Sequence, residues 1–252
     1  MIVGTANVDD LAQHATTMPA FYGEDIHFGD VTCFQLTAEM RNSAREAILP
    51  PSLHPTIPAA LSVQAYRVQT SPWGPFQYVT VRVSCRSGVR ARGFTTATVT
   101  DSDIACTALR EKLGYPARVG DIYFRSSYDG VAITVDEQDE RILKIDGIDP
   151  DPMGSNDIQY TGTLNLAHTP MGLRLLQVEG NDTSSRVDRL SSTLSNFSGA
   201  AWGNALMAPY LVIASSVAKM ELTIPTIRFV CKPEELAFTG TEPVELENQG
   251  IK

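Results

Sequence analysis

The chain has 252 residues, of which 43% are hydrophobic and 19% are charged, a composition typical of a globular protein that can bury a sizeable core. Its formal net charge of -9 argues against nucleic acid or an anionic membrane surface as a partner. No apolar run approaches the roughly 18 residues that cross a bilayer, and the first ten residues lack the pattern of a signal peptide. We therefore expect a cytoplasmic protein, with its four scattered cysteines reduced.

The N-terminal part of the chain is predicted to be irregular at first and then helical. We interpret residues 1–30 as an N-terminal arm that packs over the domain. Apolar residues at helical spacing predict a helix from Thr37 to Ala47, and the prolines that follow would end it. Ala59 to Val68 is typical of a strand that leads into a turn at residues 71–75.

The next segment has the clearest alternation in the chain. Val79, Val81, Val83 and Cys85 fall on one face of a predicted strand. Tyr78, Thr80, Arg82 and Ser84 fall on the other face. The first face is predicted to be core. The second presents a phenol, a hydroxyl and a guanidinium, and it is either the lining of a polar cavity or a face exposed to solvent.

A helix with clear ends follows a second strand at Ala91 to Val99. Asp101-Ser102-Asp103 supplies the residues that cap a helix start. The apolar face then continues to Leu113, where Gly114 is a natural C-terminal cap and Pro116 prevents continuation. The segment thus predicts a helix that ends in a rigid turn.

The rest of the chain predicts mainly antiparallel strands. Tyr128-Asp129-Gly130 indicates a hairpin. We interpret residues 149–154 as a loop and leave residues 191–207 unassigned. The expected strands are Asp121–Ser126, Val131–Val135, Arg141–Ile145, Asp157–Leu166, Leu173–Val178, Met220–Ile224 and Ile227–Cys231. The predicted fold class is α+β, predominantly antiparallel β, closed into a barrel or cone with a few helices.

The turn after the helix carries a family resemblance. Arg110-Glu111-Lys112-Leu113-Gly114-Tyr115-Pro116-Ala117-Arg118 resembles the pattern Arg-Glu-x-x-Gly-aromatic-Pro-Lys-Lys of the acetoacetate decarboxylase-like superfamily. The resemblance extends over about residues 34 to 232 and implies the family's β-cone, one domain over residues 1–252, and a homo-oligomer. It also implies that the first lysine of the pair forms a Schiff base with a keto acid. Here that position is Ala117, so the resemblance implies a member without this nucleophile.

The candidate site residues come from this motif and from the alternating strands. The motif gives Arg118, Glu111 and Tyr115 as catalytic candidates, with Arg118 as the contact for an oxyanion through its fork of donors. Family carboxylates would fall near Gln64 and Thr80, where neutral residues stand. The candidates for substrate binding are Gln64, Tyr78, Thr80 and Arg82.

The sequence lacks the motifs of metal sites, of serine hydrolases and of phosphate-binding loops. The histidines show no metal-ligand spacing, and no Gly-x-Ser-x-Gly elbow or phosphate loop is present. We therefore expect no metal and no cofactor, and a small molecule as the partner.

Three functions remain open at this point. The first is an enzyme of specialised metabolism that cyclises, dehydrates or isomerises a keto, enol or polyene intermediate without a Schiff base. The second is a Schiff-base enzyme with a relocated lysine, Lys112 or Lys219. The third is a binding or scaffold protein without catalysis.

Overall fold

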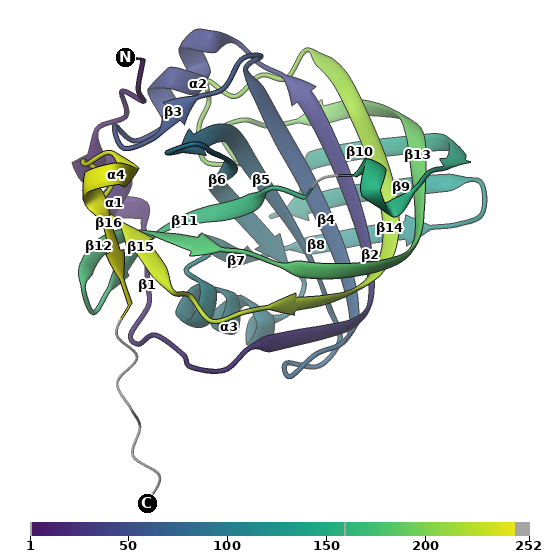
Figure 1. The fold of residues 1–252 in the computed structure, drawn as a ribbon. Helices are drawn as coiled ribbons and strands as arrows, with labels where there is room; N and C mark the ends of the chain where they lie inside the picture. Colours follow the sequence, from purple (N-terminus) through teal and green to yellow (C-terminus); the bar gives the residue numbers. More distant parts are fainter. Residues whose placement is uncertain (1, 159, 245–252) are drawn as a thin grey trace, which may run out of the picture.

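Strands dominate the molecule, which is known from a computed structural model that describes residues 2–158 and 160–244 (Figure 1). The first half of the chain contributes β1 (Thr16–Thr17), β2 (Ile26–Glu39), β3 (His54–Pro55), β4 (Ala60–Thr70), β5 (Phe76–Ser87), β6 (Arg90–Thr100), β7 (Ala117–Val119) and β8 (Asp121–Ser126). The second half contributes β9 (Gly130–Glu137), β10 (Glu140–Pro152), β11 (Gly162–Thr169), β12 (Gly172–Val178), β13 (Asn181–Phe197), β14 (Leu211–Ile224), β15 (Phe229–Cys231) and β16 (Thr241–Pro243). The helices are α1 (Val8–His14), α2 (Asn42–Ile48), α3 (Asp103–Leu113), α4 (Ala237–Gly240) and the 3₁₀ turn η1 (Ser155–Asp157).

These strands form one curved sheet within the described residues. Its order is β16-β15-β12-β11-β6-β5-β4-β2-β14-β13-β10-β9-β8, with β1, β3 and β7 paired at the side of β11, β5 and β6. Most pairs are antiparallel, whereas β11 and β7 run parallel to β6. The sheet curls so that β8 to β10 lie across the interior from β4 and β5 (Figure 1). The predicted fold class, mostly antiparallel β with a few helices, is confirmed.

Three predictions of local structure need correction, and the structure places one segment that the sequence left unassigned. Residues 1–30 are not simply irregular, because Asn7 caps helix α1 and the chain then adds β1 to the sheet. Residues 37–39 belong to β2, since pairing with β4 and β14 outweighs the helical spacing, and α2 starts only at Asn42. Strand β10 continues through most of the predicted loop at residues 149–154 because β13 pairs with it as far as Pro152. The unassigned segment begins inside β13, which ends at Phe197.

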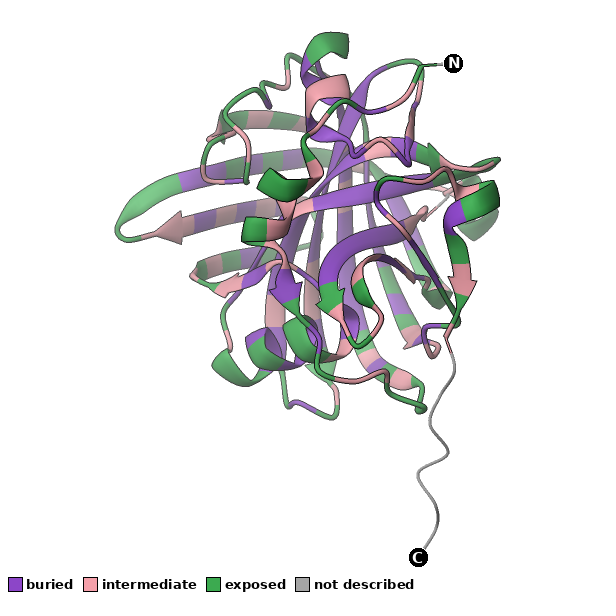
Figure 2. Cartoon of the chain, turned by 90° about the vertical axis from the view of Figure 1, so that its left-hand side faces the viewer, coloured by how far each residue is buried: buried purple, intermediate pink, exposed green. Residues whose placement is uncertain are grey.

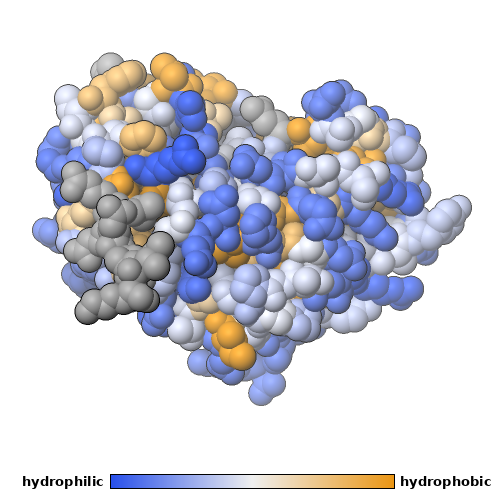
Figure 3. Space-filling view, turned by 60° about the horizontal axis from the view of Figure 1, so that its bottom comes forward, coloured by the Kyte–Doolittle hydropathy of each residue, from blue (hydrophilic) through white to orange (hydrophobic). Residues whose placement is uncertain are grey.

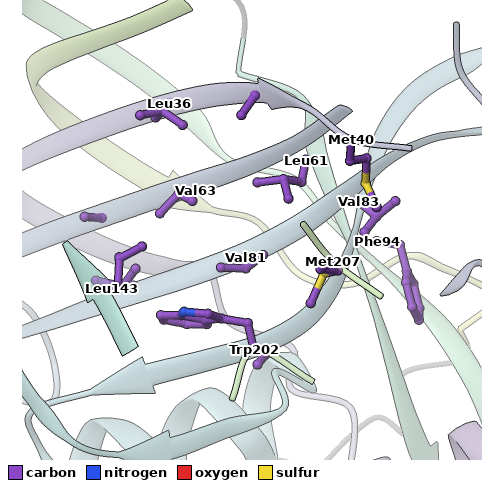
Figure 4. Close-up of a cluster of buried hydrophobic side chains, with 14 of the residues drawn as sticks. Leu36, Met40, Leu61, Val63, Val81, Val83, Phe94, Leu143, Trp202 and Met207 are labelled. Atoms are coloured by element: carbon purple, nitrogen blue, oxygen red, sulfur yellow. The ribbon is translucent and has the colours of Figure 1, made fainter. Parts of the chain in front are cut away.

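The predicted alternation of β5 separates two environments. Its valine face packs into a large apolar cluster that includes Leu36, Val63 and Trp202 (Figure 4). The face with Tyr78, Thr80 and Arg82 is buried as well. Figure 2 shows the buried residues on the inner parts of the strands and the exposed ones on helices and at hairpin tips. Strand β5 therefore has core on one face and a buried polar environment on the other.

Helix α3 fixes the turn that carries the family-like motif. The Ser102 hydroxyl accepts a hydrogen bond from the Ala105 N–H at 3.3 Å, which caps the helix start as predicted. Gly114 ends the helix with φ of 66°, and its N–H donates to the Arg110 carbonyl at 3.1 Å. A Cβ at Gly114 would lie 2.1 Å from Leu176 Cδ1, so only glycine fits. The turn therefore delivers Tyr115 and Ala117 to fixed positions against β6.

One face of the surface, the helices and the cysteines complete the description of the fold. In the view of Figure 3, apolar side chains appear in small groups separated by hydrophilic ones. None of the helices within residues 2–158 and 160–244 combines the length and the apolar character needed to cross a membrane. All four cysteines are free and buried.

Candidate functional site

The polar faces of β4 and β5 line a cavity of about 250 Å³, which we name the Arg82 cavity. The antiparallel register places Gln64 opposite Thr80 and Tyr66 opposite Tyr78. The loop before β11, the ends of β12 and β14 and the start of β13 complete the walls. The residues that line it are Gln64, Tyr66, Tyr78, Arg82, Arg90, Arg92, Tyr115, Tyr160–Thr163, Val178–Asp182, Met220, Leu222 and Ile224.

Arg82 differs from the other cavity residues because its guanidinium is buried and no carboxylate in the described part of the chain pairs with it. The residue is 1% exposed. Its Nη1 donates to the Thr161 carbonyl at 3.0 Å and to Thr163 Oγ1 at 2.8 Å. Its Nε and Nη2 atoms have no hydrogen-bond partner among the described residues. Buried charges in proteins are normally paired, so this cation favours an anion nearby. Both donors are fully buried, so an anion would have to displace part of the lining to reach them.

Four phenols accompany this cation. The rings of Tyr66 and Tyr78 stack with centroids 4.5 Å apart, and Tyr115 meets Tyr78 edge to face at 6.4 Å. Burial raises the pKa of Tyr66, Tyr78 and Tyr115 above the usual value, while the positive charge of Arg82 lowers each pKa by less. Burial also raises the pKa of Tyr160. The phenols therefore stay neutral and act as hydrogen-bonding groups rather than as bases.

A short hydrogen-bond chain orients one side of the cavity. The Tyr66 hydroxyl donates to Gln64 Oε1 at 2.8 Å, and Gln64 Nε2 donates to Gln35 Oε1 at 2.5 Å. The Tyr66 proton is used in this chain. Its hydroxyl oxygen can thus only accept further hydrogen bonds, whereas Arg82 can only donate them.

Thr80 supports the cavity without lining it. It is 1% exposed, its hydroxyl accepts from Thr98 Oγ1 at 3.1 Å, and it also lies 3.4 Å from the Ala97 carbonyl. This hydroxyl is satisfied inside the sheet between β5 and β6. Its predicted role in substrate binding would therefore be indirect.

Ala117 lies on the same side of the sheet as the cavity residues, but it lines a separate hollow, described below, and not the Arg82 cavity. It stands opposite Thr98 in the parallel pairing of β6 with β7, and Thr98 in turn contacts Thr80. Residues directly opposite in a sheet project to the same face. The Ala117 methyl accordingly packs in the apolar cluster that contains Tyr78 and Tyr115.

Arg118 and Glu111, two of the predicted catalytic residues, lie outside the Arg82 cavity. Strand alternation turns Arg118 away from the face of Ala117, and it forms a bidentate ion pair with Glu137, with Nη2 2.8 Å from Oε2. Its guanidinium also lies 5.8 Å from the Trp202 ring centroid. Glu111 is exposed on the outer face of α3. The structure thus brings Tyr115 to Gln64, Tyr78 and Arg82, but it does not bring Arg118 or Glu111 there.

A larger hollow of about 550 Å³ opens beside Arg118, and we name it the β6 cleft. It forms where β11, which pairs with β6 as far as Phe94, separates from β7, which pairs from Thr98 onward. Arg118 is already neutralised by Glu137 there, and Arg110 Nε donates to Thr16 Oγ1 at 3.1 Å. Because the unsatisfied cation lies in the Arg82 cavity, that cavity is the better candidate site despite its smaller volume.

Neither of the lysines considered as a relocated nucleophile lines the Arg82 cavity. The Lys112 ammonium lies 5.0 Å from the Tyr22 ring centroid on the outside of α3. Lys219 lines a different hollow, beside Ser126–Gly130. Within residues 2–158 and 160–244, no lysine or histidine lines the cavity, and no cluster of histidine, cysteine, aspartate and glutamate could hold a metal ion.

Several lining residues were not among the sequence candidates. Gln64 comes from the family resemblance, and the period of two along β4 puts Tyr66 on the same face, so Tyr66 could have been found from the sequence. Tyr160, Thr163 and Glu179 could not, because they enter through the pairing of β11 with β6 and with β12, which local patterns do not reveal.

Comparisons with known proteins agree on the fold. No curated protein matches the sequence. The chain is similar to the structure of acetoacetate decarboxylase from Legionella pneumophila, with 16% identity, a TM-score of 0.72 and coverage of 82% of this chain and 88% of that one. It is similar to the enduracididine biosynthesis enzyme MppR complexed with pyruvate, with 15% identity, a TM-score of 0.66 and coverage of 81% and 89%.

A third structure, an acetoacetate decarboxylase-like enzyme from Sphingomonas wittichii RW1, is 13% identical with a TM-score of 0.68, covering 82% of this chain and 93% of that one. The model of the family described as acetoacetate decarboxylase matches residues 12–193, which include α3, the turn at Gly114 and most of the strands around the Arg82 cavity. The chain therefore belongs to the acetoacetate decarboxylase family.

Proposed function

We propose that the chain is an enzyme of specialised metabolism that binds an anionic keto or enol compound in the Arg82 cavity and acts on it without a Schiff base. The observation that carries this proposal is the buried guanidinium of Arg82, whose Nε and Nη2 have no hydrogen-bond partner among the residues that the structure describes. A guanidinium binds a carboxylate or an enolate oxygen through paired N–H donors. One structure of similar fold, MppR, is complexed with pyruvate, which is a keto acid of this chemical class.

No lysine of residues 2–158 and 160–244 lines the cavity, and this supports chemistry other than covalent catalysis. Ala117 stands at the position that the family resemblance assigns to the nucleophile, and its methyl faces the cavity side of the sheet. A preorganised cation and neutral phenols stabilise negative charge that develops on an oxygen. Cyclisation, dehydration and isomerisation of a keto compound all pass through such an oxyanion, so these reactions fit the cavity. An uncharged polyene fits it less well, because it would leave Arg82 unpaired.

A binding protein without catalysis is the second candidate. Glu179 and Asp182, the carboxylates that the described lining contains, are both exposed to solvent, so the described residues offer no buried base. A ligand could be held there without reaction. Incubation with keto acids, followed by analysis of the products, separates the two candidates, because only an enzyme would convert them.

Ligand binding tests the proposed site directly. Calorimetric titration with 2-oxopentanoate should show binding to the wild-type protein and none to Arg82→Met. Arg86→Gln is the matched control, since Arg86 lies on the same strand, carries the same charge and is exposed outside the cavity. Binding that survives Arg82→Met, or that is lost equally in Arg86→Gln, would overturn the assignment.

A further inference from the structure

A second guanidinium reaches the mouth of the Arg82 cavity from β6. Arg92 is 9% exposed, and its Nη2 forms an ion pair with Glu179 Oε1. Arg90 Nη1 lies 3.6 Å from the same oxygen. Two cations therefore share one carboxylate, which is itself 44% exposed and free to turn toward water.

The position of Arg92 relative to Arg82 is fixed by one short segment. Arg82 donates to the Thr161 carbonyl and to the Thr163 hydroxyl. The side chain of Arg92 passes over Gly162, which stands between Thr161 and Thr163. A Cβ added at Gly162 would lie 3.2 Å from Nη1 and 3.3 Å from Cζ of Arg92. Both guanidiniums thus contact the segment of residues 161–163, Arg82 from the interior of the cavity and Arg92 from its mouth. A side chain at position 162 would therefore push the Arg92 guanidinium outward by a few tenths of an ångström.

The charges of the lining favour an additional anion. Three guanidiniums, those of Arg82, Arg90 and Arg92, face the cavity together with the carboxylates of Glu179 and Asp182. Asp182 is exposed and accepts a hydrogen bond from Ser184 at 3.1 Å. Among the described residues Arg82 has no anionic partner, and Glu179 must serve both Arg90 and Arg92.

From these contacts we infer that the substrate of the Arg82 cavity is a compact diacid, whose first acidic group binds Arg82 and whose second displaces Glu179 from Arg92. This inference rests on the proposed function and specifies its substrate class. Glu179 is then the internal occupant of the second anion site and competes with the ligand. The apolar wall of Val178, Met220 and Leu222 accommodates the carbon chain between the two charges.

Two keto acids of equal length provide the test. 2-Oxoglutarate and 2-oxopentanoate both have five carbon atoms and differ in one carboxylate, so calorimetric titration of each isolates the second site. The wild-type protein should bind 2-oxoglutarate about tenfold more tightly, as expected of one additional charge-assisted contact. Arg92→Gln should abolish this difference and leave the affinity for 2-oxopentanoate unchanged, whereas Glu179→Gln should enlarge it because the competitor is gone.

Two further variants control for charge and for folding. Gly162→Ala keeps every charge but displaces Arg92, so it should also reduce the preference for the diacid. Arg86→Gln removes an exposed charge outside the cavity and should leave the preference intact. Equal affinities for the two acids, or a preference that persists in Arg92→Gln, would overturn this inference alone. A failure of the wild-type protein to bind either acid would instead overturn the proposed function.

Discussion

The Nη1 atom of Arg82 lies 2.8 Å from Oγ1 of Thr163, and this hydrogen bond joins β5 to β11 across the intervening strand β6. The side chain crosses β6 at Gly93, where an added Cβ would lie 3.1 Å from the Cβ, Cδ and Nε atoms of Arg82. A glycine under the crossing and a hydroxyl at its end therefore hold a buried cation in one orientation. The cost of burying that charge explains the first prediction.

Replacement of Arg82 by methionine should abolish ligand binding without lowering the stability of the fold. An unpaired buried guanidinium costs free energy of folding, and apolar replacements of buried charges often stabilise by about 1–4 kcal/mol. The loss of the bonds to Thr161 and Thr163 offsets part of this gain. We predict that thermal denaturation of Arg82→Met shows a Tm equal to or above that of the wild-type protein. A Tm lowered by many degrees would show that Arg82 is a structural residue.

The nucleophile position can be tested by restoring it. Wild-type protein treated with pyruvate and borohydride should show no adduct by intact mass, because no lysine among the described residues lines the cavity. Ala117→Lys should form an adduct, since position 117 lines the β6 cleft, where a keto acid can reach it. The matched control is Arg118→Lys, which faces Glu137 instead and should remain unmodified. An adduct on the wild-type protein would return the relocated lysine to consideration.

Arg118 is expected to act on stability and not on binding. Its ion pair with Glu137 is partly exposed and its guanidinium lies over Trp202, so Arg118→Ala should lower the free energy of unfolding by about 1 kcal/mol. The affinity for 2-oxopentanoate should not change. Chemical denaturation and calorimetry on the same variant measure both quantities. A large loss of affinity with unchanged stability would restore Arg118 as a site residue.

Buried thiols and phenols should make the protein sensitive to alkali. Burial raises the pKa of Cys33 and of Cys85 from 9.0 to about 12, and it raises the pKa of Tyr66 and Tyr78 well above 10.0. The unfolded chain releases these protons first as the pH rises, so each group lowers the free energy of unfolding by about 1.4 kcal/mol per pH unit in its window. These groups should therefore leave the free energy of unfolding unchanged below pH 9 and lower it progressively above pH 9.

Urea denaturation at several pH values between 7 and 11 would measure this decline. Cys33→Ala provides the control, since it removes one group and should make the decline less steep. A free energy of unfolding that stays level up to pH 11 would contradict the burial of these groups.

Local sequence patterns predicted the elements around the site but not how the site closes. The alternation of β5 placed Tyr78 and Arg82 on one face, and the capping residues of α3 placed Tyr115 at the end of a turn. The pairing of strands that are far apart in the sequence determined which other residues reach the cavity. The parallel ladder of β7 with β6 turned Arg118 away from the cavity, and the start of β11 brought Thr163 to Arg82. Such pairing depends on residues far apart in the chain, which a periodicity of two or 3.6 residues does not encode.

A crystal structure of the protein with 2-oxopentanoate would show whether Arg82 binds the anionic group of a keto acid. We expect a ligand oxygen within hydrogen-bond distance of Nε or Nη2 of Arg82, with the carbon chain against Val178 and Met220. A ligand that binds in the β6 cleft beside Arg118, with Nε and Nη2 of Arg82 still unpaired, would contradict it.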